Sequence, residues 1–375
     1  MKNIIIFLIS IISILGCNSD DHHTTQPTGD NFIINSFKTP YVFVVNGADN
    51  NISIVDISQF KEVGKFYLKD AIYPHHIYWN HKLGKRNENY EGALLAVAIT
   101  GKDLSGGHGG HSGTSTGNYK VMVLDAYDGS TVKEIKLNHS PHNAIFLNID
   151  ESFPSEELWI SQYDEKNSYI LTFDTKTWNR LDSIPVGAGL SEVTFDYNGN
   201  AYATNTIDGT VDIISTKNKL KLRKHKVGEN PVGAWNGINY MLVDNEKSRS
   251  LTLINKKTLE IDETIELNFT PGYAIEQSIS YNDTTNTHKT RIWVTNTSGS
   301  IYAIQQFGNN KNWEFDASIP TGAGAHAIAN FDNGLIVSNQ DDNTITYINL
   351  LDFSKKSTKV GKKPNGMVVL FDPTR

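Results

Sequence analysis

The chain has 375 residues, enough to bury the core of one large repeat domain or of two ordinary domains. Its 34 Lys and Arg against 41 Asp and Glu give a net charge of −7, and no run of basic residues is present, which argues against a nucleic-acid partner. Abundant Tyr, Phe, Thr, Asn and Gly favour strands and turns over helices. The single cysteine, Cys17, excludes an internal disulfide.

The first residues have the pattern of an export signal. Lys2 precedes an apolar run over residues 4–15, which is too short to span a bilayer comfortably. The run ends in Ile-Leu-Gly followed by Cys17, which resembles the lipobox at which bacteria cleave a signal peptide and attach lipid, including palmitate, to the cysteine. We therefore expect a signal peptide over residues 1–16 and a lipid anchor at Cys17. The alternative is an ordinary secretory signal with a chance cysteine.

The residues after this cysteine are predicted to form a tether. Residues 17–38 are polar, with Asp, Thr, Gly and Pro, and are expected to be the lipidated N-terminus and a flexible linker. Asp20 and Asp21 resemble the surface-export signal of lipoproteins in one Gram-negative lineage, although a polar tether needs no such role. The expected location is the outer membrane, with the chain facing the periplasm or exposed at the cell surface.

From residue 41 onward the chain repeats with a period of about forty residues, the length of a four-stranded propeller blade. Residues 41–46 (YVFVVN) predict a strand, an Asn-rich turn follows, and residues 52–56 (ISIVD) predict the next strand. The same succession returns at residues 201–214 and at residues 291–304. We therefore expect an all-β, seven-bladed β-propeller over residues 39–375.

The two ends of the repeat predict how the ring closes. The first cycle begins at its second strand, and the last one ends in an apolar run over residues 367–371 that has no later strands to pair with. This C-terminal strand is expected to become the innermost strand of the first blade, which removes the open sheet edge.

These residues resemble the YVTN/YncE family of bacterial β-propellers. Residues 293–296 (WVTN) and 41–44 (YVFV) come closest to the family's repeated phrase, and the resemblance covers about residues 40–372. It implies the propeller fold. It implies little about activity, because propellers host many unrelated functions.

One short motif, called the slot, occurs once in each cycle, after a turn and before an apolar run. Its seven occurrences are residues 73–77, 140–144, 190–193, 231–234, 271–274, 325–328 and 364–367. His75, His142 and His326 occupy equivalent positions in three of them, and His76 and Glu192 lie one position further on. Because the slots are expected to ring one mouth of the central channel, these side chains are predicted to converge there.

A Gly/His-rich insertion is predicted to face the same mouth. Residues 101–118 contain His108 and His111 among glycines and are expected to connect the second and third strands of a blade. His139, three residues before His142, is expected nearby. Imidazole is a ligand for copper and zinc, and Gly/His-rich tracts indicate metal binding by composition. The alternative is that these histidines only hydrogen-bond backbone groups.

The propeller is also distantly similar to those of nitrous oxide reductases, which hold a copper cluster on channel-mouth histidines, and of cytochrome d1 proteins, which hold a haem. The resemblance implies copper or haem. The chain has no Cys-x-x-Cys-His haem attachment motif, which argues against electron-transfer catalysis and makes haem the weaker expectation.

The expected function is therefore capture or delivery of copper or zinc by a membrane-anchored propeller, with an outer-membrane transporter or another protein as partner. His75, His142 and His326 would be rigid ligands, and His108 and His111 a mobile clamp. No catalytic motif is present, so a binding protein is favoured over an enzyme. The alternatives are a scaffold that binds protein or polysaccharide, and a haem or copper redox protein.

Overall fold

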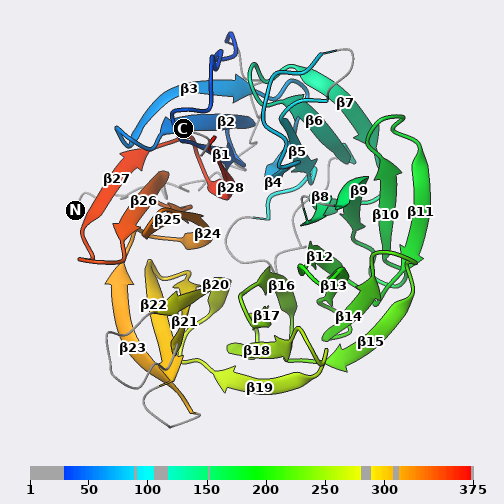
Figure 1. Ribbon diagram of the computed structural model, residues 1–375, viewed down its shortest axis with the longest axis vertical. Helices are drawn as coiled ribbons and strands as arrows, with labels where there is room; N and C mark the ends of the chain where they lie inside the picture. Colours follow the sequence, from blue (N-terminus) through cyan, green and yellow to red (C-terminus); the bar gives the residue numbers. More distant parts are fainter. Residues whose placement is uncertain are drawn as a thin grey trace, which may run out of the picture.

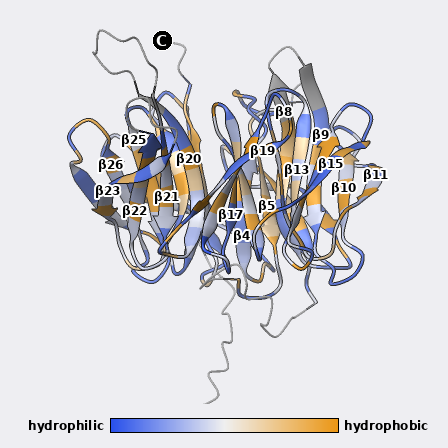
Figure 2. Cartoon of the chain, turned by 90° about the horizontal axis from the view of Figure 1, so that it is seen from below, coloured by the Kyte–Doolittle hydropathy of each residue, from blue (hydrophilic) through white to orange (hydrophobic). Residues whose placement is uncertain are grey.

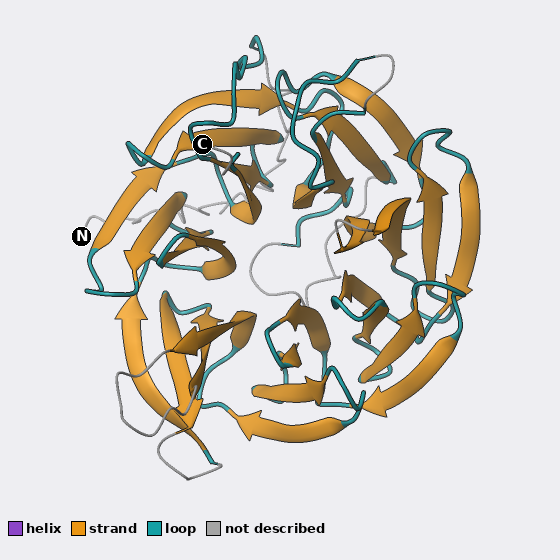
Figure 3. Cartoon of the chain, in the orientation of Figure 1, coloured by secondary structure: helices purple, strands orange, loops and turns teal. Residues whose placement is uncertain are grey.

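The computed structural model describes residues 29–87, 91–104, 117–150, 153–279, 289–306 and 312–372. These residues form seven four-stranded antiparallel sheets arranged in a ring around a central channel (Figure 1), and no helix occurs among them (Figure 3). The predicted seven-bladed propeller is therefore confirmed. No helix long and apolar enough to cross a bilayer is found in the described part of the chain.

Each sheet contributes one strand to each of four concentric layers. The innermost strands are β28 (Pro364–Leu370), β4 (Pro74–Trp79), β8 (Pro141–Asp150), β12 (Leu190–Phe195), β16 (Pro231–Asn236), β20 (Pro271–Ile279) and β24 (Ala325–Phe331). The second strands are β1 (Tyr41–Asn46), β5 (Leu94–Ile99), β9 (Phe153–Gln162), β13 (Asn200–Asn205), β17 (Tyr240–Asn245), β21 (Lys289–Asn296) and β25 (Gly334–Asn339).

The outer half of each sheet follows the same order. The third strands are β2 (Asn51–Asp56), β6 (Lys120–Asp125), β10 (Tyr169–Asp174), β14 (Thr210–Ser215), β18 (Ser250–Asn255), β22 (Ser300–Gln306) and β26 (Thr344–Asn349). The outermost strands are β3 (Lys61–Tyr67), β7 (Thr131–Lys136), β11 (Arg180–Pro185), β15 (Lys221–Lys226), β19 (Ile261–Glu266), β23 (Trp313–Pro320) and β27 (Lys355–Lys359).

The middle strands are buried because neighbouring sheets cover both of their faces. All six residues of β2 and all six of β13 are buried, whereas most residues of the outermost strand β15 are exposed. Figure 2 shows the hydrophobic residues concentrated within the strands. The core therefore lies between adjacent blades, and burial of this apolar surface stabilises the ring.

The ring closes as the sequence predicts. The C-terminal strand β28 pairs antiparallel with β1, with Leu370 opposite Tyr41 and Met367 opposite Val44. The first sheet therefore has the order β28-β1-β2-β3 and joins the two ends of the described chain. This pairing leaves no gap in the ring.

Part of the segment predicted as tether packs on the ring. The Phe32 amide donates to the Lys65 carbonyl at 2.9 Å, and the Ile34 amide donates to the Tyr127 carbonyl at 2.7 Å. Ile34 and Phe37 are buried in the cluster between the first two blades. Residues 32–37 thus belong with the propeller, because two large apolar side chains anchor them there.

Candidate metal centre

The slot residues lie at the start of the innermost strands, on what we call the strand-start face of the ring. All seven innermost strands have a β-bulge after their first residue. At each bulge, two residues of the innermost strand lie opposite one residue of the second strand. The bulge pairs are His75-His76, His142-Asn143, Ser191-Glu192, Val232-Gly233, Gly272-Tyr273, His326-Ala327 and Asn365-Gly366. A bulge bends its strand and re-aims side chains, and here it repeats around the channel.

Hydroxyl groups on the second strands hold several bulges in place. Ser161 Oγ accepts the amide of Asn143 at 2.9 Å, Thr204 Oγ1 accepts that of Glu192 at 3.0 Å, and Ser338 Oγ accepts that of Ala327 at 3.0 Å. At a bulge these buried backbone amides lack a carbonyl partner on the second strand. The hydroxyl oxygens accept their hydrogen bonds instead. This explains the Ser or Thr near the end of the second strand in these cycles.

Three of the bulge histidines form one buried group, which we call the histidine cluster: His75, His76 and His142. Each is about 1% exposed, and each offers one ring nitrogen within 4.8 Å of the other two. The ring centroids of His75 and His76 are 4.3 Å apart, and those of His76 and His142 are 4.7 Å apart. Two neighbouring innermost strands, β4 and β8, therefore bring together three imidazoles in the channel.

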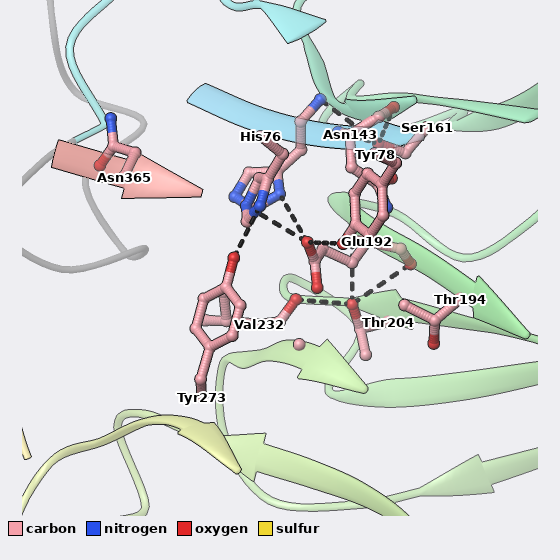
Figure 4. Close-up of polar contacts among 12 residues, drawn as sticks. His76, Tyr78, Asn143, Ser161, Glu192, Thr194, Thr204, Val232, Tyr273 and Asn365 are labelled. Atoms are coloured by element: carbon pink, nitrogen blue, oxygen red, sulfur yellow. Dashed lines mark hydrogen bonds and ion pairs between the residues drawn. The ribbon is translucent and has the colours of Figure 1, made fainter. Parts of the chain in front are cut away.

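Glu192 on β12 lies against this cluster (Figure 4). Its Oε1 is 3.2 Å from His76 Nε2 and 3.9 Å from His142 Nδ1, and the side chain is fully buried. Burial raises the pKa of the Glu192 carboxyl well above its usual range, and Asp244 raises it further whenever Asp244 is ionised, while a hydrogen bond from Tyr78 opposes this shift. In the metal-free protein this shift favours the protonated carboxyl group. A bound cation would displace the proton and leave a carboxylate.

Two tyrosines complete the surroundings. Tyr78 Oη is 3.4 Å from Glu192 Oε1, and Tyr273 Oη is 2.7 Å from His76 Nδ1. Burial raises the pKa of both phenols well above the usual value, so both remain neutral hydroxyls at neutral pH. His76 thus has a hydroxyl at one ring nitrogen and an oxygen of the Glu192 carboxyl group at the other (Figure 4).

The other histidines predicted as metal ligands lie at different distances from the histidine cluster. His326 is 4% exposed and lies at the edge of the cluster, with its ring centroid 6.0 Å from that of His75. The structure does not bring His139 there, because its side chain is 47% exposed and its Nδ1 lies 3.3 Å from Asp164 Oδ2. His108 and His111 lie outside the described residues, as does Cys17.

The described ends of the Gly/His insertion do lie on the strand-start face. The insertion connects β5 and β6, the second and third strands of its blade. The Thr100 amide donates to the Tyr73 carbonyl at 3.1 Å, and the Gly101 amide donates to the Ile72 carbonyl at 3.0 Å. Both acceptors lie just before β4 begins. The insertion therefore begins beside the start of β4, where His75 lies.

Sequence reasoning left Glu192, Tyr273 and Tyr78 out of the predicted ligand set. Glu192 and Tyr273 occupy the second position of their bulge pairs, the same position as His76, so the repeat itself contains the signal. Tyr78 has no such signal, because it lies further along β4. The second position of the pair therefore contributes as much to the site as the first.

The donor set suits a transition metal. Zinc binds imidazole nitrogen at about 2.0–2.1 Å, which separates two ligand nitrogens of a tetrahedral site by about 3.4 Å. The three ring nitrogens lie within 4.8 Å of one another, so movements of about an ångström would bring them to bonding distance. With Glu192 Oε1 as a fourth donor, the set is three nitrogens and one oxygen, which suits zinc or copper.

The fold and this site define a β-propeller with a buried histidine cluster in its channel. No protein-family model and no curated protein matches the sequence. Similar solved structures are β-propellers. One is a functionally unknown protein from Desulfotomaculum acetoxidans, with a TM-score of 0.64 and 9% identity, covering 88% of this chain and 99% of that one.

Two further similar structures have stated activities. The periplasmic gluconolactonase PpgL of Pseudomonas aeruginosa has a TM-score of 0.63 and 10% identity, covering 89% of this chain and all (100%) of that one. The dihydro-haem d1 dehydrogenase NirN has a TM-score of 0.56 and 13% identity, covering 91% of this chain and 77% of that one. At these identities the likeness establishes a common fold and nothing about activity.

Proposed function

We propose that this propeller binds a transition-metal ion, copper or zinc, at the histidine cluster in its channel. The observation that carries the proposal is the buried convergence of His75, His76 and His142, with one nitrogen of each within 4.8 Å of the others and a carboxylate oxygen 3.2 Å from His76. Neutral imidazole is the commonest protein ligand for these metals.

The surrounding residues have assignable roles. His76 would bind through Nε2, the nitrogen that faces Glu192, while Tyr273 holds Nδ1 and fixes the ring orientation. Glu192 would supply the fourth donor and a negative charge once its proton is released. A bound ion would act as a Lewis acid there. We assign the site to capture or delivery of the metal, since that role needs no catalytic group beside the ion.

The N-terminal sequence supports a location for this activity. We propose that residues 1–16 are cleaved and that Cys17 carries lipid, which would anchor the propeller to the outer membrane. An outer-membrane transporter would then be the partner that receives or supplies the metal. A test is metabolic labelling with a palmitate analogue, in which the native chain is labelled and Cys17→Ser is not.

Metal binding is tested on protein expressed from Asn18 onward, so that the lipid anchor is absent. Metal content is measured by mass spectrometry, and zinc and copper(II) are titrated by calorimetry. We expect a dissociation constant below about 1 μM and one ion per chain. No binding in this range would refute the proposal, and a Soret absorbance band in the purified protein would favour haem instead.

A matched pair of variants tests the site. His142→Ala removes a member of the histidine cluster, whereas His139→Ala, three residues earlier, removes an imidazole that is 47% exposed and lies against Asp164. We expect His142→Ala to weaken zinc binding at least tenfold and His139→Ala to leave it unchanged. Equal effects of the two substitutions would place the metal elsewhere.

A further inference from the structure

A second feature of the channel begins below the histidine cluster, toward the strand-end face, where the innermost strands finish. A cavity of about 440 Å³ is lined by residues from all seven innermost strands, most of which lie beyond the bulge pairs. Its volume lies in the range of small-molecule sites. We call this cavity the aromatic cup.

The lining of the aromatic cup is aromatic and aliphatic. Its rings include those of Trp79, Phe146, Phe195, Tyr197 and Trp235. Among the described residues that line it there is no Lys, Arg, Asp or Glu. A charged ligand would therefore lose its hydration without gaining an ionic partner from the lining, so the cup favours a neutral one.

Polar side chains are spread along the aromatic cup, with His81, Thr194, Asn236 and Asn330 in its lining, but the buried imidazole of the histidine cluster lies at one end. His76, Tyr78 and Tyr273 line the cup and also contact the histidine cluster or Glu192. The Tyr273 hydroxyl lies 2.7 Å from His76 Nδ1, so this end presents a buried hydroxyl and imidazole to an occupant (Figure 4). Such a site fixes the orientation of a mainly apolar molecule through one polar group.

One wall of the aromatic cup is fixed in place by the fold. The rings of Trp235 and Tyr273 stack with centroids 3.7 Å apart, and Trp235 Nε1 donates to Asp244 Oδ1 at 2.8 Å. The stacked pair and its buried hydrogen bond restrain both rings before any ligand arrives. Pre-organisation of this kind reduces the entropy lost on binding.

We propose that the aromatic cup binds a neutral, mainly apolar ring compound with a polar group that contacts Tyr273 and His76. The ring plane lies against the aromatic walls, and the polar group exchanges hydrogen bonds with the hydroxyl and imidazole at the closed end. The cup shares His76 and Tyr273 with the metal centre, but ligand binding in the cup does not require a bound metal.

The first test uses the neutral fluorophore N-phenyl-1-naphthylamine with chelator-treated protein, so that the result does not depend on the metal. We expect a saturable rise in fluorescence with a dissociation constant below about 100 μM. Ala329 lines the aromatic cup and is 9% exposed, so Ala329→Phe fills part of the cavity and should weaken binding at least tenfold. The control Ala323→Phe alters an exposed turn residue outside the cup and should not.

A second test compares competing ligands that differ in one polar group. In competition against the fluorophore, 1-naphthol should bind about fivefold to tenfold more tightly than naphthalene, because only naphthol has the polar group. Tyr273→Phe should abolish that difference while retaining binding of naphthalene. Naphthalene-1-sulfonate should compete poorly, since the lining offers it no cation. Absence of fluorophore binding, equal binding by Ala329→Phe, or equal competition by the sulfonate would overturn the proposal.

Discussion

The hydroxyl of Tyr273 and Nδ1 of His76 lie 2.7 Å apart across the channel, although 197 positions separate the two residues in the chain. They come from β20 and β4, which are not neighbours in the ring (Figure 1). Both residues occupy the second position of a bulge pair. The repeated bulge therefore places side chains of distant blades in one buried site.

Tyr273→Phe tests whether this contact orients the metal ligand. The substitution removes the hydroxyl and keeps the ring that stacks on Trp235. Loss of a group that orients a metal-binding imidazole typically costs 10–100-fold in affinity, and we expect zinc binding to weaken by about that factor. Calorimetry measures the change, with Tyr197→Phe, an exposed tyrosine, as the control. Unchanged affinity would show that His76 is oriented by other contacts.

Metal affinity should fall as the pH is lowered. Imidazole must be neutral to bind a metal, and its ordinary pKa is about 6.5, so protons compete with the ion below that pH. Each ligand imidazole that must lose a proton adds about tenfold per pH unit to the weakening. Calorimetric titration of zinc at pH 7.5, 6.5 and 5.5 measures this slope. His142→Ala should give a shallower slope, and an affinity independent of pH would contradict binding by imidazole.

The sequence revealed the ring because its period is visible without any knowledge of contacts. Seven slots, in a repeat of about forty residues that some insertions lengthen, predict seven blades, and the unpaired last strand predicts the closure with β1. The bulges were not predictable, because an extra residue shows only in the register between two strands. The same holds for the site. The repeat predicts which blades contribute to it, but it does not show that the second residue of each bulge pair points into the channel.

His139 shows why proximity in sequence was a poor guide. It is only three residues from His142, yet it lies in the connection from the outer strand β7, and its side chain is half exposed. His142 is already inside β8 and is buried. The aromatic cup had no sequence signal of its own, because Trp235 and Phe195 satisfy the same apolar pattern as residues buried between blades.

The asparagine that ends several second strands should stabilise its blade. Asn245 is fully buried, donates to Ser250 Oγ at 3.2 Å and Thr252 Oγ1 at 3.0 Å, and accepts the Gly228 amide at 3.0 Å. Asn245→Ala leaves these groups without their partner and should lower the free energy of unfolding by about 2–4 kcal/mol. Urea unfolding followed by circular dichroism measures the loss. The exposed Asn218→Ala should change it by less than about 0.5 kcal/mol.

Removal of the closing strand should prevent stable folding. A chain that ends at Lys363 lacks β28, exposes the hydrogen-bonding edge of β1 and loses the buried Leu370. We expect the cooperative unfolding transition to be lost, together with amide-exchange protection in β1 to β3. Removal of residues 373–375 alone is the control and should leave both unchanged. A cooperative transition in the longer truncation would show that the ring does not depend on this closure.

Stability should depend on pH through Asp244. Burial raises the pKa of its carboxyl well above the usual range, and the Glu246 charge raises it further, against the opposing hydrogen bonds from Trp235 and Gly233. The folded state therefore holds a proton that the unfolded state releases at lower pH. Its stabilising contribution is complete below the unfolded pKa of about 3.9 and is lost as the pH rises toward the folded value.

Asp244→Asn removes this titration and keeps an oxygen that accepts from Trp235 Nε1. The unfolding free energy of the variant, relative to the native protein, should therefore increase between pH 5 and pH 8, by about 1.4 kcal/mol for each unit of pKa shift within that range. Thermal unfolding at both pH values measures the difference, with the exposed Asp182→Asn as the control, for which we expect no such increase. If the variant loses stability relative to the native protein as the pH rises, the carboxylate of Asp244 is stabilised in the fold, and its hydrogen bonds outweigh its burial.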